Sequence, residues 1–131
     1  MGNSDTTWEA GAERALALYK SGEYDASLAA LLVLEAEYPN VAPIQLLMGR
    51  AYFVRDQYEL ALEHFRKACE LNPDGELASL GLYQCLLQGG QADEALEEMR
   101  RYTSIHDSVT YQEIAEDAGF SLAELLAEES P

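Results

Sequence analysis

Residues that could catalyse a reaction or bind a metal are few in this chain, and they form no catalytic or metal-binding motif. The two histidines, His64 and His106, occur in no His-Glu-x-x-His motif, and the chain has no Gly-rich phosphate loop and no Asp-rich calcium loop. We interpret each histidine as a solvated helix residue. Glu94, Glu97 and Glu98 resemble a carboxylate cluster, but at helical spacing they indicate an exposed face with no base or nucleophile beside it. We therefore expect no enzymatic activity, no cofactor and no metal ion.

The cysteines and the N-terminus bear on the compartment. Cys69 and Cys85 lack a Cys-x-x-Cys spacing and fall within predicted helices, so we expect buried thiols and a reducing compartment. No stretch approaches the length of apolar residues that spans a bilayer. Residues 1–7 are polar, with an acid and no basic residue, unlike a secretory signal, and we predict that they are disordered. These features favour a soluble, cytoplasmic protein.

The charge of the chain restricts its partners. With 24 acidic and 8 basic residues the formal net charge is −16. Nucleic acid and anionic membrane are poor partners for such a surface. The acidic residues either form a solvated surface that keeps the protein soluble, or attract a basic partner. In the second case their electrostatic attraction would speed association and would weaken as the salt concentration rises.

Similar residues recur at a spacing of 34 positions, which indicates an array of repeats. Three sets show the period: Tyr24, Tyr58 and Ala92; Ser27, Ala61 and Ala95; and Leu31, Phe65 and Met99.

The middle copy, residues 42–75, resembles the tetratricopeptide repeat. The resemblance rests on Met48, Gly49, Tyr52, Ala61, Phe65, Ala68 and Pro73. One position differs, because Gln45 stands where the family has a large apolar residue. The resemblance implies a pair of antiparallel helices, in which Gly49 and Ala61 are small where the helices approach and Phe65 fills the space beside them. Three such copies imply an all-α fold, an α-solenoid of helix-turn-helix repeats.

The first and third copies, residues 8–41 and 76–109, depart from the pattern. Arg14 and Ser27 replace an apolar residue and an alanine in the first copy, as an end repeat facing water can tolerate. Tyr83 and Asp107 replace a small residue and the proline in the third, whose helices we expect to pack further apart. The repeats, assigned to residues 8–107, predict helices over 8–21, 24–37, 42–55, 58–71, 76–89 and 92–104.

Residues 110–131 predict capping helices and an acidic tail. Thr110 with Glu113, and Ser121 with Glu124, each form the pattern of a capping box, and Gly119 ends the first helix. We expect helices over 111–118 and 122–129. Their apolar residues would cover the third repeat: Tyr111, Ile114, Phe120, Leu122 and Leu125.

Two alternatives apply to this tail. Its spacings also resemble a DNA-binding helix-turn-helix, but residues 110–131 hold six acids and no Lys or Arg, which argues against nucleic acid. The stripe of Leu122, Leu125 and Leu126 could instead occupy the binding groove and compete with a partner.

The resemblance implies that a partner binds in a concave groove lined by the first helix of each pair. The expected groove residues are Leu16, Tyr19, Leu46, Arg50, Phe53, Val54, Leu77, Leu80, Gln84 and Leu87. Some family members hold the C-terminal carboxylate of heat-shock chaperones with Lys and Asn side chains. None of the equivalent positions matches here: Ala12, Leu16, Leu47, Leu77 and Gly81.

A mostly apolar groove with one central cation predicts a non-catalytic adaptor or chaperone-like escort that binds a peptide or helix with apolar anchors. The small acidic three-repeat chaperones of bacterial secretion systems are similar in repeat number, charge and groove. The alternative is an immunity or antitoxin-type inhibitor whose acidic surface neutralises a basic toxin or nuclease. We expect a monomer, or a weak homo-oligomer that associates through an uncovered end repeat.

Overall fold

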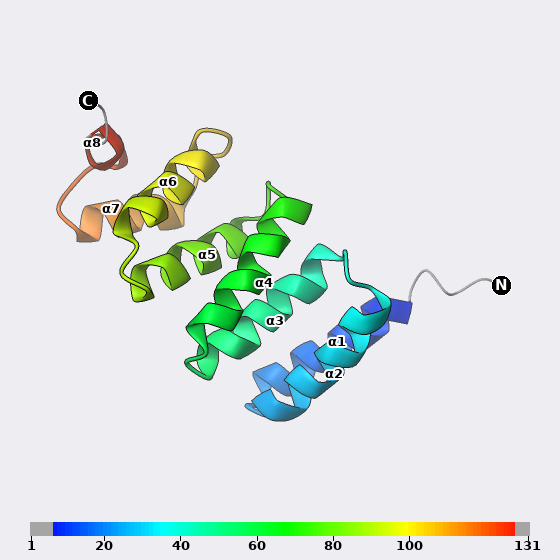
Figure 1. The fold of residues 1–131 in the computed structure, drawn as a ribbon. Helices are drawn as coiled ribbons and strands as arrows, with labels where there is room; N and C mark the ends of the chain where they lie inside the picture. The colour runs from blue at the N-terminus through cyan, green and yellow to red at the C-terminus, as the bar shows by residue number, and fades with distance from the viewer. Residues whose placement is uncertain (1–6, 128–131) are drawn as a thin grey trace.

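The computed structural model describes residues 7–127, which form eight α-helices and no strand (Figure 1). They are α1 (Thr7–Lys20), α2 (Tyr24–Glu37), α3 (Ala42–Val54), α4 (Tyr58–Leu71), α5 (Glu76–Gln88), α6 (Ala92–Thr103), α7 (Val109–Asp117) and α8 (Leu122–Ala127). The first six agree with the predicted helices to within one residue at each end. Residues 1–7 were predicted to be disordered, but α1 begins at Thr7. Residues 1–6 and, in the tail, residues 128–131 lie outside the described residues.

Within each repeat, a tight turn reverses the chain between the two helices. Gly22, Asp56 and Gly90 stand 34 positions apart and have φ angles of 85°, 61° and 76°. The residue after each turn donates its backbone N–H to a carbonyl of the preceding helix, as Glu23 does to Leu18 at 2.9 Å. Of these three turn residues, Asp56 alone is not a glycine. Aspartate adopts the left-handed conformation more readily than most residues do. The turns thereby set the antiparallel pairs α1/α2, α3/α4 and α5/α6.

The buried side chains form two adjoining clusters along the array. One is built from α1, α2 and α3, around Ala15, Leu31 and Met48. The other extends from α4 to α7, around Phe65, Met99 and Tyr111. Tyr52 packs against both clusters, so the core is continuous from repeat to repeat, as a solenoid requires.

Phe65 of α4 lies against two glycines, one from each neighbouring helix. A Cβ built on Gly49 of α3 would stand 2.8 Å from the ring, and one built on Gly81 of α5 would stand 2.4 Å from it. The absent side chains therefore allow α3 and α5 to approach the ring closely. In the third repeat Tyr83 occupies the position of Gly49 and is buried edge-on against Tyr111, with ring centroids 5.6 Å apart. That this substitution widens the helix pair stays a prediction.

Buried polar side chains face each other at equivalent positions in the second and third repeats. Gln45 is fully buried in α3; its side-chain oxygen accepts a hydrogen bond from Nδ1 of His64 at 2.6 Å, and its side-chain nitrogen donates to Glu35 at 2.9 Å. Its equivalent, Ser79 in α5, donates to Glu98 at 2.6 Å. The prediction that His64 is solvated is wrong, because only 15% of its side chain is exposed.

Glu98 likewise lies in the interior and not on the exposed face predicted for it. Its residue is 8% exposed, and both carboxylate oxygens accept hydrogen bonds from Arg101, at 2.8 and 2.6 Å. The carboxylate is therefore satisfied by a hydroxyl and a guanidinium, which offsets the cost of its burial. The other histidine, His106, is partly exposed beside Asp74.

The buried position of His64 makes the stability of the fold depend on pH. Burial lowers the pKa of His64 below its ordinary 6.5 and outweighs Glu35 and Glu63, which raise it. The unfolded chain therefore takes up a proton first as pH falls, so this stability is present above pH 6.5 and is lost below it. We expect the free energy of unfolding to fall more for the wild type than for His64→Gln between about pH 8 and about pH 5.5. Urea denaturation at both pH values measures it, and an equal fall in the two proteins would contradict the assignment.

The tail caps the third repeat, with two differences from prediction. The first helix begins earlier, because Ser108 and not Thr110 is its N-cap and accepts a hydrogen bond from the Tyr111 amide at 3.1 Å. Phe120 is 37% exposed and contributes less to the cover than expected. The box of Ser121 and Glu124 is present, with reciprocal bonds of 2.8 and 3.1 Å. Gly119, at φ 91°, ends α7 as predicted.

Helix α8 lies beside α6 and α7 at the C-terminal end of the array (Figure 1). Leu122, Leu125 and Leu126 pack against the cluster that contains Tyr111, and Arg100 of α6 donates to the carbonyl of Leu126 at 2.8 Å. The alternative in which this leucine stripe occupies the groove is therefore wrong for this structure. Between residues 7 and 127, no helix combines the length and the apolar character needed to cross a membrane.

Candidate partner-binding groove

Three adjoining pockets form a continuous groove over the first helices of the repeats. The first lies between α1 and α3, the second is lined by α1, α3, α4 and α5, and the third lies between α3 and the start of α5. Their volumes are about 290, 290 and 220 Å³. Shared residues join them, because Arg50 lines the first and second, Leu46 the first and third, and Leu77 the second and third.

Most of the residues predicted for the groove come together in these pockets. They are Leu16, Tyr19, Leu46, Arg50, Phe53, Leu77, Leu80 and Gln84. Val54 and Leu87 are exposed, at 38% and 45%, but lie outside the three pockets. The structure thus places eight of the ten side chains on one surface, and their role in binding a partner stays a prediction.

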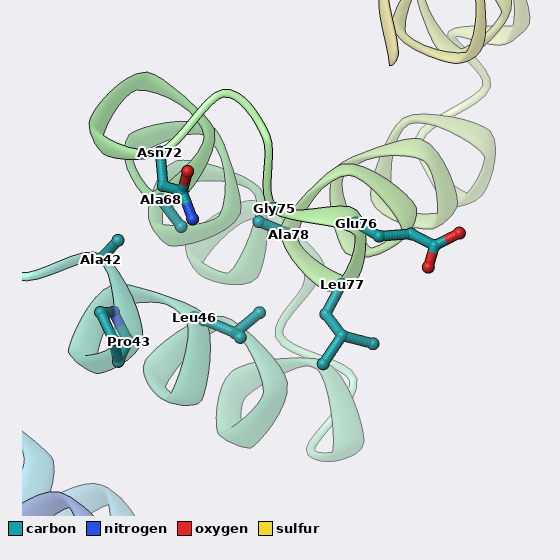
Figure 2. A pocket seen from close by; sticks show the side chains of 9 residues that line it. All are labelled: Ala42, Pro43, Leu46, Ala68, Asn72, Gly75, Glu76, Leu77 and Ala78. Atoms are coloured by element: carbon teal, nitrogen blue, oxygen red, sulfur yellow. The ribbon is translucent and has the colours of Figure 1, made fainter. Parts of the chain in front are cut away.

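The third pocket has a wall that sequence reasoning missed. Ala68 of α4, the C-cap residue Asn72 and Gly75 in the following turn face Leu46 and Leu77 across it (Figure 2). Figure 2 shows the side chains of Leu46 and Leu77 approaching one another from α3 and α5, whereas the carboxylate of Glu76 points away. The prediction considered only the first helix of each pair, so the end of α4 was left out. The turn residues Asn72, Pro73 and Gly75 were the available signal, because they bring this helix end against the next repeat.

One cation stands in the middle of the groove. The guanidinium of Arg50 lies 4.9 Å from the centre of the Tyr19 ring, a cation–π contact that joins α3 to α1. One turn further along α3, the ring of Phe53 packs edge-on against Tyr58 at the start of α4, with ring centroids 5.2 Å apart. The arrangement offers an apolar floor with a positive charge held in place, suited to an aliphatic or aromatic anchor beside a carboxylate or carbonyl oxygen.

The chemistry of the remaining reactive residues is unfavourable to catalysis. Burial raises the pKa of the Cys69 thiol to about 12 and that of Cys85 to about 11, so neither is a ready nucleophile. Both are buried free thiols, as predicted. Among residues 7–127 no group of three His, Cys, Asp or Glu side chains could hold a metal ion. At the positions of the carboxylate clamp, Ala12 and Leu47 are buried apolar residues, which excludes Lys or Asn contacts from there.

Comparison with known proteins agrees with the repeat pattern. Residues 52–114 match the family model described as tetratricopeptide repeat. A search of curated proteins found no match. The fold is similar to that of the type III secretion chaperone SycD of Yersinia enterocolitica in complex with a peptide of the translocator YopD, with a TM-score of 0.77, 21% identity and 98% of each chain covered.

Two further solved structures share the fold. The first tetratricopeptide domain of Spaghetti (RPAP3), bound to the HSP90 peptide SRMEEVD, gives a TM-score of 0.77 at 16% identity, covering 92% of this chain and 93% of that one. MamA of Desulfovibrio magneticus RS-1 gives 0.71 at 23% identity, covering 80% and 61%. Fold and groove define an α-solenoid of antiparallel helix pairs. The family match at residues 52–114 and the fold of the described residues identify these helix pairs as tetratricopeptide-type repeats.

Proposed function

We propose that this protein binds a segment of a partner protein in the groove, as an adaptor or chaperone-like escort without catalysis of its own. The observation that carries the proposal is the continuity of three mainly apolar pockets across all three repeats, joined by Leu46, Arg50 and Leu77. Exposed apolar surface of this kind on a single chain marks a binding site. Two proteins of the same fold are described in complex with peptides, which supports the assignment.

The groove favours one kind of partner segment over another. The peptide SRMEEVD bound by the RPAP3 domain is acidic, whereas the acids Glu9, Glu13 and Glu76 border the groove of this chain. These carboxylates would repel an acidic peptide, and no clamp for a C-terminal carboxylate is present. A segment with apolar anchors, one acceptor for Arg50 and no further acid fits better. A segment of this kind is compatible with a chaperone-like escort. A cytoplasmic location stays a prediction.

Leu77 offers the cleanest test of the groove. It is 60% exposed and lines two of the three pockets, so Leu77→Glu should leave the fold intact while placing a carboxylate in the apolar surface. We expect the affinity for the partner to fall at least about tenfold, because the charge is desolvated when the anchors bind. Ile105→Glu is the matched control, since Ile105 is 53% exposed between α6 and α7, away from the groove.

The measurement is quantitative capture of the partner from native lysate, followed by titration with the purified partner. Loss of binding in Leu77→Glu but not in Ile105→Glu supports the groove. Equal binding by both variants and the wild type would contradict it.

The net charge of −16 favours a second candidate, an inhibitor that neutralises a basic protein through its acidic surface. Such a complex should weaken steeply as ionic strength rises, because exposed charges are screened within about 8–10 Å at physiological salt. Binding in the apolar groove should respond weakly. Titrations of the partner with Leu77→Glu at low and at high salt distinguish binding in the groove from binding to the acidic surface. A partner that still binds the variant at low salt but is lost at high salt would identify the acidic surface as the binding site.

A further inference from the structure

Asn72, the C-cap residue of α4, presents a hydrogen-bond donor to the third pocket. The residue is exposed and lines this pocket. Its side-chain oxygen Oδ1 accepts a hydrogen bond from the backbone N–H of Asp74 at 3.3 Å, which assigns the oxygen end of the amide to the turn. The side-chain nitrogen Nδ2 lies 3.3 Å from the place where a Cβ on Gly75 would stand. Figure 2 shows this nitrogen beside Ala68, directed toward the pocket.

The turn that carries Asn72 is held by α6 and by the connection between α6 and α7. Four side-chain contacts join these segments: Arg101 to the carbonyl of Pro73 at 3.0 Å, Tyr102 to the carbonyl of Asp74 at 3.4 Å, His106 to the carboxylate of Asp74 at 2.9 Å and Ser108 to the carboxylate of Glu76 at 2.5 Å. The turn is therefore positioned before a partner arrives. A donor on such a turn loses little conformational entropy when it binds.

The charges around the third pocket favour a neutral acceptor for this donor. Glu76 is the one charged residue among those that line the pocket, and its carboxylate points away from it (Figure 2). Asp74 adds a second carboxylate in the same turn. A carboxylate or phosphate of a partner would approach these acids with no lining Lys or Arg to offset the repulsion. A main-chain carbonyl carries no charge and accepts from an amide nitrogen.

The apolar part of the pocket favours an aliphatic side chain beside that carbonyl. Ala68 and Ala78 are buried, at 1% and 5% exposed, and line the pocket together with Leu46 and Leu77. The small alanine side chains leave open the volume of about 220 Å³. A polar side chain that entered here would lose its water without gaining hydrogen-bond partners from these four residues.

We propose that Asn72 orients the bound segment in the third pocket. An aliphatic side chain of the partner enters beside Leu46 and Leu77, and the main-chain carbonyl next to it accepts a hydrogen bond from Nδ2 of Asn72. The inference rests on the proposed function, because it concerns the same groove. The anchor supplies apolar contact, and the hydrogen bond fixes the register of the segment along the groove.

Asn72→Asp tests the donor with the smallest change of shape. Aspartate keeps an oxygen that can accept from the Asp74 amide, but it replaces the nitrogen by a second acceptor that would face the partner carbonyl. We expect the affinity to fall at least about tenfold, because that carbonyl loses its donor and meets a negative charge. Asn40→Asp is the matched control, since Asn40 is exposed and lines none of the three pockets. It should bind like the wild type.

The probe is a synthetic peptide selected from a random library for binding to the wild-type chain and for loss of binding to Leu77→Glu. Titration calorimetry compares its affinity for the wild type, Asn72→Asp and Asn40→Asp, after circular dichroism has verified equal helix content. If the library yields no peptide that distinguishes the wild type from Leu77→Glu, the proposed function fails and this inference fails with it. If the selected peptides bind Asn72→Asp as tightly as the wild type, the groove stands and the role of Asn72 alone is overturned.

Ester substitution along the selected peptide separates a direct contact from an indirect effect of the variant. An ester carbonyl is a weaker acceptor than an amide carbonyl, so an ester next to the aliphatic anchor weakens a hydrogen bond made there. We expect one position at which the ester lowers the affinity for the wild type about threefold or more and leaves the affinity for Asn72→Asp unchanged. Esters that weaken binding to both proteins by the same factor at every position would overturn the contact.

Discussion

Tyr111→Ala is expected to lower the free energy of unfolding by about 3–5 kcal/mol, the usual loss when a buried aromatic residue becomes alanine. Tyr111 is fully buried although it belongs to the tail and not to the repeats. Its ring packs edge-on against Tyr83 at 5.6 Å and lies 6.1 Å from Tyr102. Removing it leaves a cavity between α5, α6 and α7 and takes a hydrogen-bond partner from Ser79. Urea denaturation followed by circular dichroism measures the loss.

Tyr111→Phe is the control that separates packing from hydrogen bonding. The hydroxyl of Tyr111 lies 2.7 Å from Oγ of Ser79, which also donates to Glu98. Because Ser79 keeps Glu98 as a partner, losing the hydroxyl should cost only about 1 kcal/mol. If Tyr111→Ala cost no more than Tyr111→Phe, the tail would not be the packed cap that the structure describes.

Gly81→Ala is expected to destabilise the protein by about 1–3 kcal/mol, although alanine is the better helix former by about 1 kcal/mol. The new Cβ would stand 2.4 Å from the ring of Phe65, and the ring also packs against Gly49, where a Cβ would stand 2.8 Å from it, so the ring has little room to retreat. Propensity and packing therefore predict opposite signs. Packing should win because the overlap is with a 3% exposed ring.

Gly89→Ala provides the comparison for Gly81→Ala in the same denaturation experiment. Gly89 follows α5, and a Cβ there would meet its nearest atom at 3.5 Å, an ordinary contact. We expect this variant to be neutral or stabilised by up to about 1 kcal/mol. A stabilised Gly81→Ala would show that Phe65 does not pin α4 against α5.

The repeat helices were predictable because their signals are local and recur. The 34-residue period sets the register of the six repeat helices, and Gly22 and Gly90 mark the turns within the first and third repeats. The first cap of the tail was not predictable in the same way, because Ser108 and Thr110 offer similar hydroxyls. Tertiary structure decides between them: Ser108 also donates to Glu76 of α5 at 2.5 Å, a contact across the third repeat.

For the buried polar pairs, the 34-residue correspondence is visible in the sequence, but the burial of the side chains is not. Gln45 and Ser79 stand 34 apart, as do His64 and Glu98, so the correspondence could be read from the sequence. On helical spacing alone, however, His64 and Glu98 belong with the exposed residues. Only the packing of the second helix onto the first shows that they turn inward and bond to Gln45 and Ser79. The same dependence on packing explains why Ala68 and Asn72 were missed as a groove wall.

The groove was largely predictable because a repeat places one face of each first helix on one surface. Its outer limits were not, since Val54 and Leu87 share the helical face but lie beyond the pockets. Where a groove ends depends on the twist between repeats, which single helices do not encode.

Photo-cross-linking at Leu77, with the adduct mapped by mass spectrometry, tests the central claim most directly. A photoreactive residue at position 77 should link a single segment of the partner that contains apolar anchors, and one at Leu46 should link the same segment, because both side chains line the third pocket. A photoreactive residue at position 67, where Lys67 lines none of the three pockets, should give no adduct with that segment. Adducts formed at Lys67 and absent at positions 46 and 77 would contradict binding in the groove.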